Sequence, residues 1–180
     1  MKVHFGCGSN YMDGWVNVDI NHGVRADKYC SITHDPHLNA FFPNNSANFI
    51  YHEHVLEHLT AEDGKRFLAH CYRILKPNGV MRIAMPDLLH VIDRYNDGAW
   101  WRDEWIQSGK YPEGKNIRTK GEYVNIAMRE WEHKFLYDAE TLWLYLKDVG
   151  FTGRVTRFNH GQSEHAELEN LETRQDSRLI

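Results

Sequence analysis

The chain has 180 residues, which is the length of a single domain. Its formal net charge of -4 disfavours binding to nucleic acid or to an anionic membrane surface. No apolar run approaches the roughly 18 residues that a membrane span needs, and the N-terminus lacks the apolar core of a signal peptide. Three widely spaced cysteines do not form a disulfide framework. These features predict a soluble, cytoplasmic domain without nucleic-acid or membrane partners, and they leave room for a homodimer.

The chain alternates strand signals with turns and helices. Strands are predicted at residues 2–5, 15–20, 29–33, 47–51, 80–85 and 151–158. One helix begins after the hydroxyl cap of Thr60 and ends before the turn at residues 76–79. A second amphipathic helix is predicted at residues 138–149. This alternation predicts an α/β fold with a mostly parallel sheet.

Residues 88–131 break the alternation. Four of the six tryptophans lie within residues 100–131, and a polar stretch occupies residues 108–121. The segment follows the fifth predicted strand, and loops at the carboxyl ends of parallel strands surround the ligand crevice of an open sheet. We interpret residues 88–131 as an aromatic insertion in one domain of residues 1–180. It could be a mini-core or dimer contact, a cap over a substrate, or both.

The strongest motif joins the first two predicted strands. Residues 3–10 read VHFGCGSN and residues 16–20 read VNVDI. Glycines let a ligand approach the backbone, and Asp19 at the next strand's end can accept both hydroxyls of a ribose. Tyr11 replaces the third glycine of the dinucleotide fingerprint, and Asp19 follows too early for its acidic residue. NAD is therefore disfavoured.

With these motifs the chain resembles the class I S-adenosylmethionine-dependent methyltransferases, and in particular a small type-11-like group. The segments that carry the resemblance are FGCGSN (5–10), GWVNVDI (14–20), FIYHEHVLEHL (49–59), LKPNGVMRIAMPD (75–87) and EHKFLYDAETLWLYLKDVGF (132–151). The resemblance implies a Rossmann-like fold, with a mostly parallel central sheet flanked by helices. Residues 178–180 read like the beginning of the last strand of that sheet, and we expect this strand to be short or truncated. It implies S-adenosylmethionine as cofactor and methylation of an oxygen or nitrogen nucleophile on a small-molecule or glycan-type acceptor.

The resemblance also implies roles for individual residues. The turn at residues 6–8 would cradle the methionine part of the cofactor, Asp19 would bind the ribose, and Asp35 at the third strand's end would contact adenine. His52 and Glu53 would lie near the sulfonium and the acceptor. The expected cofactor-binding residues are Phe5, Gly6, Cys7, Gly8, Ser9, Asn10, Asp19, Ile20, Asp35 and His52.

Two features depart from the family pattern. Pro36 follows Asp35 and has no backbone N–H with which to contact adenine. The link between Gly8 and Trp15 can hold one helical turn at most, although parallel strands usually need a dozen or more residues between them.

Residues 52–59, HEHVLEHL, contain the H-x-x-E-H spacing of one class of zinc proteases. On a helix, His54, Glu57 and His58 would share one face. Three interpretations stay open: a metal-dependent hydrolase, a metal-free VLEHL turn of the kind common in methyltransferases, and a metal site within a methyltransferase. Relatives that act on small-RNA ends or quinone precursors bind a divalent ion through a glutamate, a Glu–His pair and a later histidine.

Glu57, His58 and His133 match three of those four positions, and His54 replaces the first glutamate. Three imidazoles and one carboxylate would suit zinc better than magnesium. Our expectation is nonetheless the metal-free one, with His133, His58 and Glu53 as candidate catalytic bases. A non-catalytic cofactor-binding module is the remaining alternative.

Overall fold

The computed structural model describes residues 1–109 and 117–180. The predicted polar stretch at 108–121 therefore lies partly outside the described residues. Among the described residues, none of the helices combines the length and the apolar character needed to cross a bilayer.

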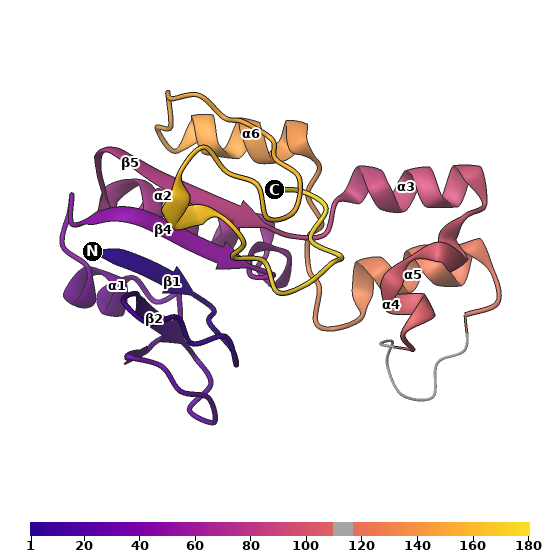
Figure 1. Ribbon diagram of the computed structural model, residues 1–180, viewed down its shortest axis with the longest axis horizontal. Coiled ribbons are helices and arrows are strands. Elements are labelled where there is room, and N and C mark those ends of the chain that lie inside the picture. The colour runs from indigo at the N-terminus through magenta and orange to yellow at the C-terminus, as the bar shows by residue number, and fades with distance from the viewer. Residues whose placement is uncertain (110–116) are drawn as a thin grey trace.

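A five-stranded sheet with the order β3-β2-β1-β4-β5 forms the centre of the fold (Figure 1). Its strands are β1 (Lys2–Phe5), β2 (Val16–Asp19), β3 (Lys28–Tyr29), β4 (Ala47–Glu53) and β5 (Leu75–Ala84). Every neighbouring pair is parallel, which confirms the predicted Rossmann-like sheet. The strand order reverses between β1 and β4, and ligands bind open α/β sheets beyond the carboxyl ends of strands at such a switch point.

Helices cover one face of this sheet. They are α1 (Asp35–Phe41), α2 (Ala61–Ile74) and α6 (Ala139–Asp148), whose apolar side chains share one core with β1 and β4. The predicted start of α2 is confirmed, because the Thr60 hydroxyl accepts a hydrogen bond from the Asp63 N–H at 3.1 Å. Asp138 caps α6 in the same way, through the N–H of Thr141.

The C-terminal segment covers the opposite face. Leu168 of the short 3-10 helix η3 (Ala166–Leu168) packs with Trp15 and Tyr51, and Glu172 forms a buried ion pair with Arg82. The predicted strand at 151–158 is wrong, because this stretch is not a strand and is largely exposed, without a face to bury. Residue 179 instead forms an isolated antiparallel bridge with Met85.

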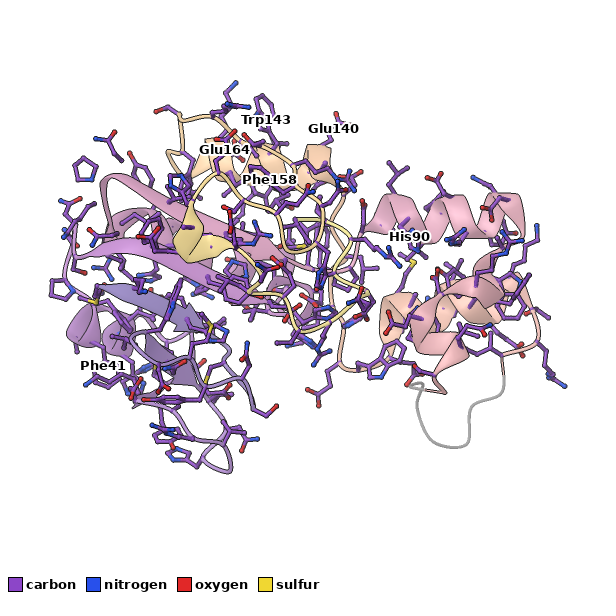
Figure 2. The ribbon with its side chains drawn as sticks, in the orientation of Figure 1. Phe41, His90, Glu140, Trp143, Phe158 and Glu164 are labelled. Carbon is purple, nitrogen blue, oxygen red and sulfur yellow. The ribbon has the colours of Figure 1, made fainter. Side chains whose placement is uncertain are left out.

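Residues 88–131 form a separate helical lobe, toward which β4 and β5 point (Figure 1). It contains α3 (Leu88–Asp97), η2 (Trp100–Arg102), α4 (Glu104–Gln107) and α5 (Lys120–Arg129). The lobe has its own small core, in which Trp105 stacks on the buried Tyr123 at 5.4 Å between ring centroids. Figure 2 shows the side chains of this lobe, including His90 of α3.

Two histidines lie inside the sheet layers. His4 packs against Tyr51 on one face, and His52 packs against Phe67 on the other, with ring centroids 5.0 and 5.4 Å apart respectively. Removal from water lowers the pKa of each imidazole from 6.5 to about 4. Both side chains are therefore neutral at pH 7.

These histidines make stability depend on pH. The unfolded chain takes up two protons near pH 6.5 that the folded protein does not bind until about pH 4, so the free energy of unfolding falls with falling pH within this window. We expect a loss of about 3 kcal/mol between pH 7 and pH 5, measured by urea unfolding. The loss should be about half as large in His52→Leu, and equal stability at both pH values would contradict the prediction.

Candidate active site

The turn after β1 is built on two glycines with left-handed backbone conformations. Gly6 has a φ of 66° and Gly8 a φ of 51°, and the N–H of Cys7 between them donates to the carbonyl of Val18. A Cβ at Gly6 would come within 2.4 Å of the Val55 side chain, whereas a Cβ at Gly8 would meet nothing within 4 Å. Gly6 therefore permits close packing, and Gly8 borders open space.

Asp19 at the end of β2 is tied directly to this turn. Its carboxylate accepts the N–H of Gly8 at 2.7 Å and the N–H of Asn21 at 2.8 Å. The neighbouring Ile20 is 67% exposed. The glycine turn, the strand-end carboxylate and an exposed apolar side chain thus lie side by side, as the sequence motif predicts.

The other residues predicted around the turn have mixed environments. Phe5 and Cys7 are buried, and the Cys7 thiol donates to the carbonyl of Arg25. Ser9 is exposed, and the N–H of Asn10 donates to the carbonyl of Cys7 at 2.9 Å. Ser9 and Asn10 can therefore face a ligand more readily than the side chains of Phe5 and Cys7.

Asp35, the residue expected to contact adenine, does not lie where the sequence predicted. Asp35 does not end a strand, because β3 stops at Tyr29 and Asp35 is the first residue of α1. Its carboxylate lies 3.0 Å from Nε2 of His70 on α2, and this hydrogen bond lowers the pKa of Asp35. Pro36 follows it within the first turn of the helix. Asp35 thus links two helices, and its carboxylate is already engaged.

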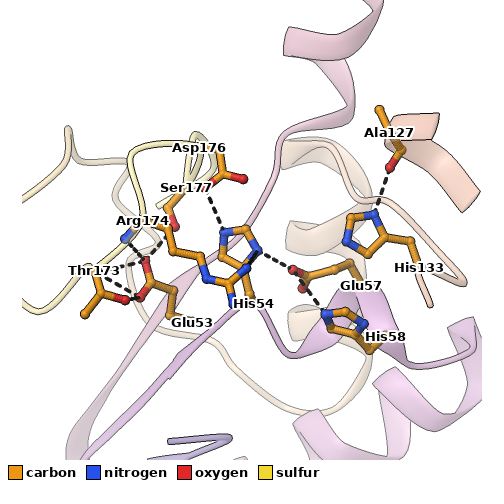
Figure 3. Close-up of polar contacts among 10 residues, drawn as sticks. All are labelled: Glu53, His54, Glu57, His58, Ala127, His133, Thr173, Arg174, Asp176 and Ser177. Carbon is orange, nitrogen blue, oxygen red and sulfur yellow. Dashed lines mark hydrogen bonds and ion pairs between the residues drawn. The ribbon is translucent and has the colours of Figure 1, made fainter. Parts of the chain in front are cut away.

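His52 and Glu53 at the end of β4 are both sequestered. His52 is fully buried. The Glu53 carboxylate accepts hydrogen bonds from four donors: the Thr173 N–H and hydroxyl, the Arg174 N–H and the Ser177 hydroxyl (Figure 3). Burial alone would raise the pKa of Glu53, but these hydrogen bonds outweigh it and the net pKa is lowered. This environment argues against Glu53 as a proton acceptor.

The H-x-x-E-H stretch does not form the expected helix face. The His54 N–H still pairs with the carbonyl of Ala84, and the chain then turns at a His54 φ of 50° into the 3-10 helix η1 (Leu56–His58). Continued pairing to β5 therefore prevents a helix from starting at His54. The turn nevertheless brings Nδ1 of His54 to 3.0 Å and Nε2 of His58 to 4.0 Å from the Glu57 carboxylate (Figure 3).

Glu57 is the central group of this cluster. Its side chain is fully buried, and the groups nearest to its carboxylate are imidazole nitrogens, Nδ1 of His54 at 3.0 Å and Nε2 of His58 at 4.0 Å. Desolvation raises the pKa of Glu57, but the interactions with His54 and His58 and a backbone hydrogen bond outweigh it, and the net pKa is lowered. A buried carboxylate is costly unless hydrogen bonds or a cation compensate it.

His133 enters the cluster from the chain that follows α5. Its Nδ1 lies 2.8 Å from the carbonyl of Ala127, which can only accept, so Nδ1 carries the proton and Nε2 has a free lone pair. Its ring lies 5.1 Å from that of His58, whose pKa is lowered by burial. Glu57, His58 and His133 each offer a ligand atom, and these atoms lie within 4.8 Å of one another. This trio could hold a divalent cation or accept a proton.

The trio borders a cavity of about 520 Å³ between the sheet, the helical lobe and the C-terminal segment. Its lining includes His54, His58 and His133, then His90, Asp103, Trp105 and Trp131 from the lobe, and Arg174, Asp176 and Arg178. The lobe and the C-terminal residues were not predicted individually. Only the density of tryptophans in residues 100–131 could have indicated them, because their positions depend on contacts between segments far apart in the sequence.

Comparisons with known proteins show what this geometry is similar to. A model of the methyltransferase domain, type 11, matches residues 3–83, which include the glycine turn, Asp19 and the H-x-x-E-H stretch. This match covers less than half of the chain. A search of curated protein sequences found no match.

Several solved structures share the fold of this chain. A S-adenosylmethionine-dependent methyltransferase from Archaeoglobus fulgidus matches 89% of the chain with a TM-score of 0.56 and 16% identity. A putative methyltransferase from Bacillus halodurans matches 83% with a TM-score of 0.53 and 12% identity. A possible histamine N-methyltransferase from Thermotoga maritima matches 84% with a TM-score of 0.52 and 15% identity. The chain spans 65%, 61% and 64% of their respective lengths.

The Archaeoglobus fulgidus protein is described as dependent on S-adenosylmethionine, and the glycine turn of this chain has room for a ligand of that kind. Gly8 leaves open space beside the backbone. Asp19 is held at the turn by two N–H groups, yet a carboxylate has further lone pairs for ribose hydroxyls. The exposed Ile20 offers an apolar surface that a purine could cover.

Proposed function

We propose that the protein transfers a methyl group from S-adenosylmethionine to an oxygen or nitrogen nucleophile of a small-molecule or glycan-type acceptor. The observation that carries this proposal is a pair of sites beyond the carboxyl ends of the parallel strands: a glycine turn bonded to Asp19, and a cavity that begins at His54 after β4 and is bordered by imidazole groups. The bound cofactor supplies an electrophilic methyl group on a positively charged sulfur. The chain supplies binding, orientation and a proton acceptor.

His133 and His58 are the proposed proton acceptors. The hydrogen bond from Nδ1 of His133 to Ala127 fixes the ring so that Nε2 can accept a proton. The buried carboxylate of Glu57 lies beside both rings and stabilises the imidazolium that results. Trp105 and Trp131 border the same cavity and offer apolar surfaces to a ring of the acceptor. Methyl transfer depends largely on holding the two reactants in line.

A metal-assisted version of this reaction is the second candidate. The fully buried Glu57 carboxylate, with two imidazole groups close enough to share a ligand, favours a cation there. Glu57, His58 and His133 would hold it, and a zinc-class ion would lower the pKa of an acceptor hydroxyl. The alternative of a metal-dependent hydrolase receives less support, because its motif is not on a helix.

The cytoplasm is the proposed location. Cys7, Cys30 and Cys71 are all free thiols, which is compatible with a reducing compartment.

Calorimetric titration with S-adenosylmethionine and S-adenosylhomocysteine tests the proposed function. We expect micromolar binding of both, and Asp19→Ala should weaken it by roughly tenfold or more because a charge-assisted hydrogen bond is lost. Asp13→Ala, an exposed acid in the same loop, is the matched control and should bind normally. If neither compound binds, the proposed methyl transfer is wrong. If Asp19→Ala binds with unchanged affinity, Asp19 is not part of the cofactor site.

A further inference from the structure

The C-terminal segment from Thr173 to Arg178 is anchored at the end of β4. Glu53, at the end of β4, accepts hydrogen bonds from Thr173, Arg174 and Ser177 at 2.7 to 3.1 Å. Beyond this anchor, the N–H of Arg178 donates to the carbonyl of Met85 at 2.9 Å. The segment therefore lies in a defined position beside the cavity, although it has no helix or strand of its own.

This position brings two arginines to the cavity. Arg174 and Arg178 both line it, and neither guanidinium group forms an ion pair with a carboxylate of the described residues. Nη1 of Arg174 lies 3.5 Å from Nδ1 of His54, next to the base cluster (Figure 3). Both side chains therefore have guanidinium N–H groups available for a ligand.

The acidic groups of the same cavity are mostly neutralised. Asp87 is paired with Arg157, and Asp103 accepts hydrogen bonds from His90, Arg94 and Tyr123. Asp176 lies 3.6 Å from Nε2 of His54. Glu104 is the one lining carboxylate without a partner in the described part of the chain. Arg174 and Arg178 are thus the arginines of the described lining that have no carboxylate partner.

We propose that Arg174 and Arg178 bind an anionic group of the methyl acceptor, a carboxylate or a phosphate, and that Glu53 is the positioning residue that holds them at the cavity. The inference rests on the proposed function and specifies its acceptor class. Arginine recognises both anions through paired N–H groups. Trp105 and Trp131 on the lobe side of the cavity favour a ring attached to that anion.

Three small probes of similar shape test this proposal: benzoate, phenyl phosphate and the neutral benzamide. Their dissociation constants are measured by tryptophan fluorescence, with and without S-adenosylhomocysteine. We expect at least one anion to bind roughly tenfold or more tightly than benzamide, as for a hydrogen bond to a charged group. The preferred anion distinguishes a carboxylate acceptor from a phosphate acceptor. Arg174→Gln and Arg178→Gln should each reduce the preference, whereas the exposed Arg129→Gln on α5 should retain it.

Thr173→Val and Ser177→Ala, which remove two of the anchoring donors, should reduce the anion preference while the affinity for S-adenosylhomocysteine is kept. Equal binding of all three probes, no binding at millimolar concentration, or a preference that survives both arginine substitutions would overturn the proposal. A preference unaffected by the two anchor substitutions together would overturn the role of Glu53. Because probe binding is also measured without S-adenosylhomocysteine, failure of the cofactor site remains distinguishable from failure of the anion site.

Discussion

Replacing Gly8 with alanine is expected to weaken the binding of S-adenosylmethionine by about 10- to 100-fold while the protein still folds. The added methyl group would meet no protein atom within 4 Å, so it would occupy space on the side where the cofactor is proposed to lie. Overpacking of such a space costs roughly 1–3 kcal/mol. The same replacement at Gly6 is expected to act on the fold, because its Cβ would lie 2.4 Å from the Val55 side chain.

The control for both variants is Gly98→Ala. Gly98 follows α3, has a φ of 71°, and has no atom within 4 Å of its added Cβ. It therefore carries the backbone strain of a left-handed alanine, roughly 1–2 kcal/mol, far from the glycine turn. Calorimetry and thermal unfolding should show lost affinity in Gly8→Ala, a loss of roughly 2–5 kcal/mol in Gly6→Ala, and normal affinity in Gly98→Ala. Full cofactor affinity in Gly8→Ala would place the cofactor elsewhere.

The parts of the fold that could be predicted from the sequence are those that local chemistry determines. Thr60 and Asp138 are side chains that cap helices, and both do so in the structure. The glycine turn and Asp19 are adjacent because parallel pairing of β1 with β2 leaves both strand ends at one edge. Each of these features depends on residues fewer than about a dozen positions apart.

The features that differ depend on tertiary contacts. Residues 151–158 have a strand-like composition, but they remain without a partner strand and are mostly exposed. Glu53 appears in the sequence as an acid next to the active site, whereas its hydrogen-bond donors lie about 120 residues further along the chain. The spacing of His54 from Glu57 and His58 is that of a helical motif, yet the N–H of His54 donates to the carbonyl of Ala84 in β5. Neither composition nor periodicity contains these long-range pairings.

The largest effect on the base cluster is expected from zinc. If the metal-assisted version of the reaction holds, metal-free protein should bind one zinc ion and melt at a higher temperature, because Glu57, His58 and His133 offer three ligand atoms within 4.8 Å of one another. Glu57→Gln and His133→Asn should each reduce zinc affinity by roughly 100-fold or more, because each removes a direct zinc ligand. Replacing a residue that only hydrogen-bonds to a ligand already lowers metal affinity by roughly 10- to 100-fold. His160→Gln, an exposed histidine outside the trio, is the control and should bind zinc normally.

The opposite result would support the metal-free mechanism. If zinc neither binds stoichiometrically nor raises the melting temperature, the imidazole groups act as proton acceptors, and His133→Asn should lower methyl transfer by roughly 10²- to 10⁴-fold while cofactor affinity stays unchanged. The pH dependence of methyl transfer then tests His58. Burial lowers the pKa of His58, so its ring stays unprotonated at pH 7. Activity that depends on His58 should therefore decline only when the pH falls below the ordinary pKa of a histidine. An activity that is already lost at pH 7 would exclude His58 as the base.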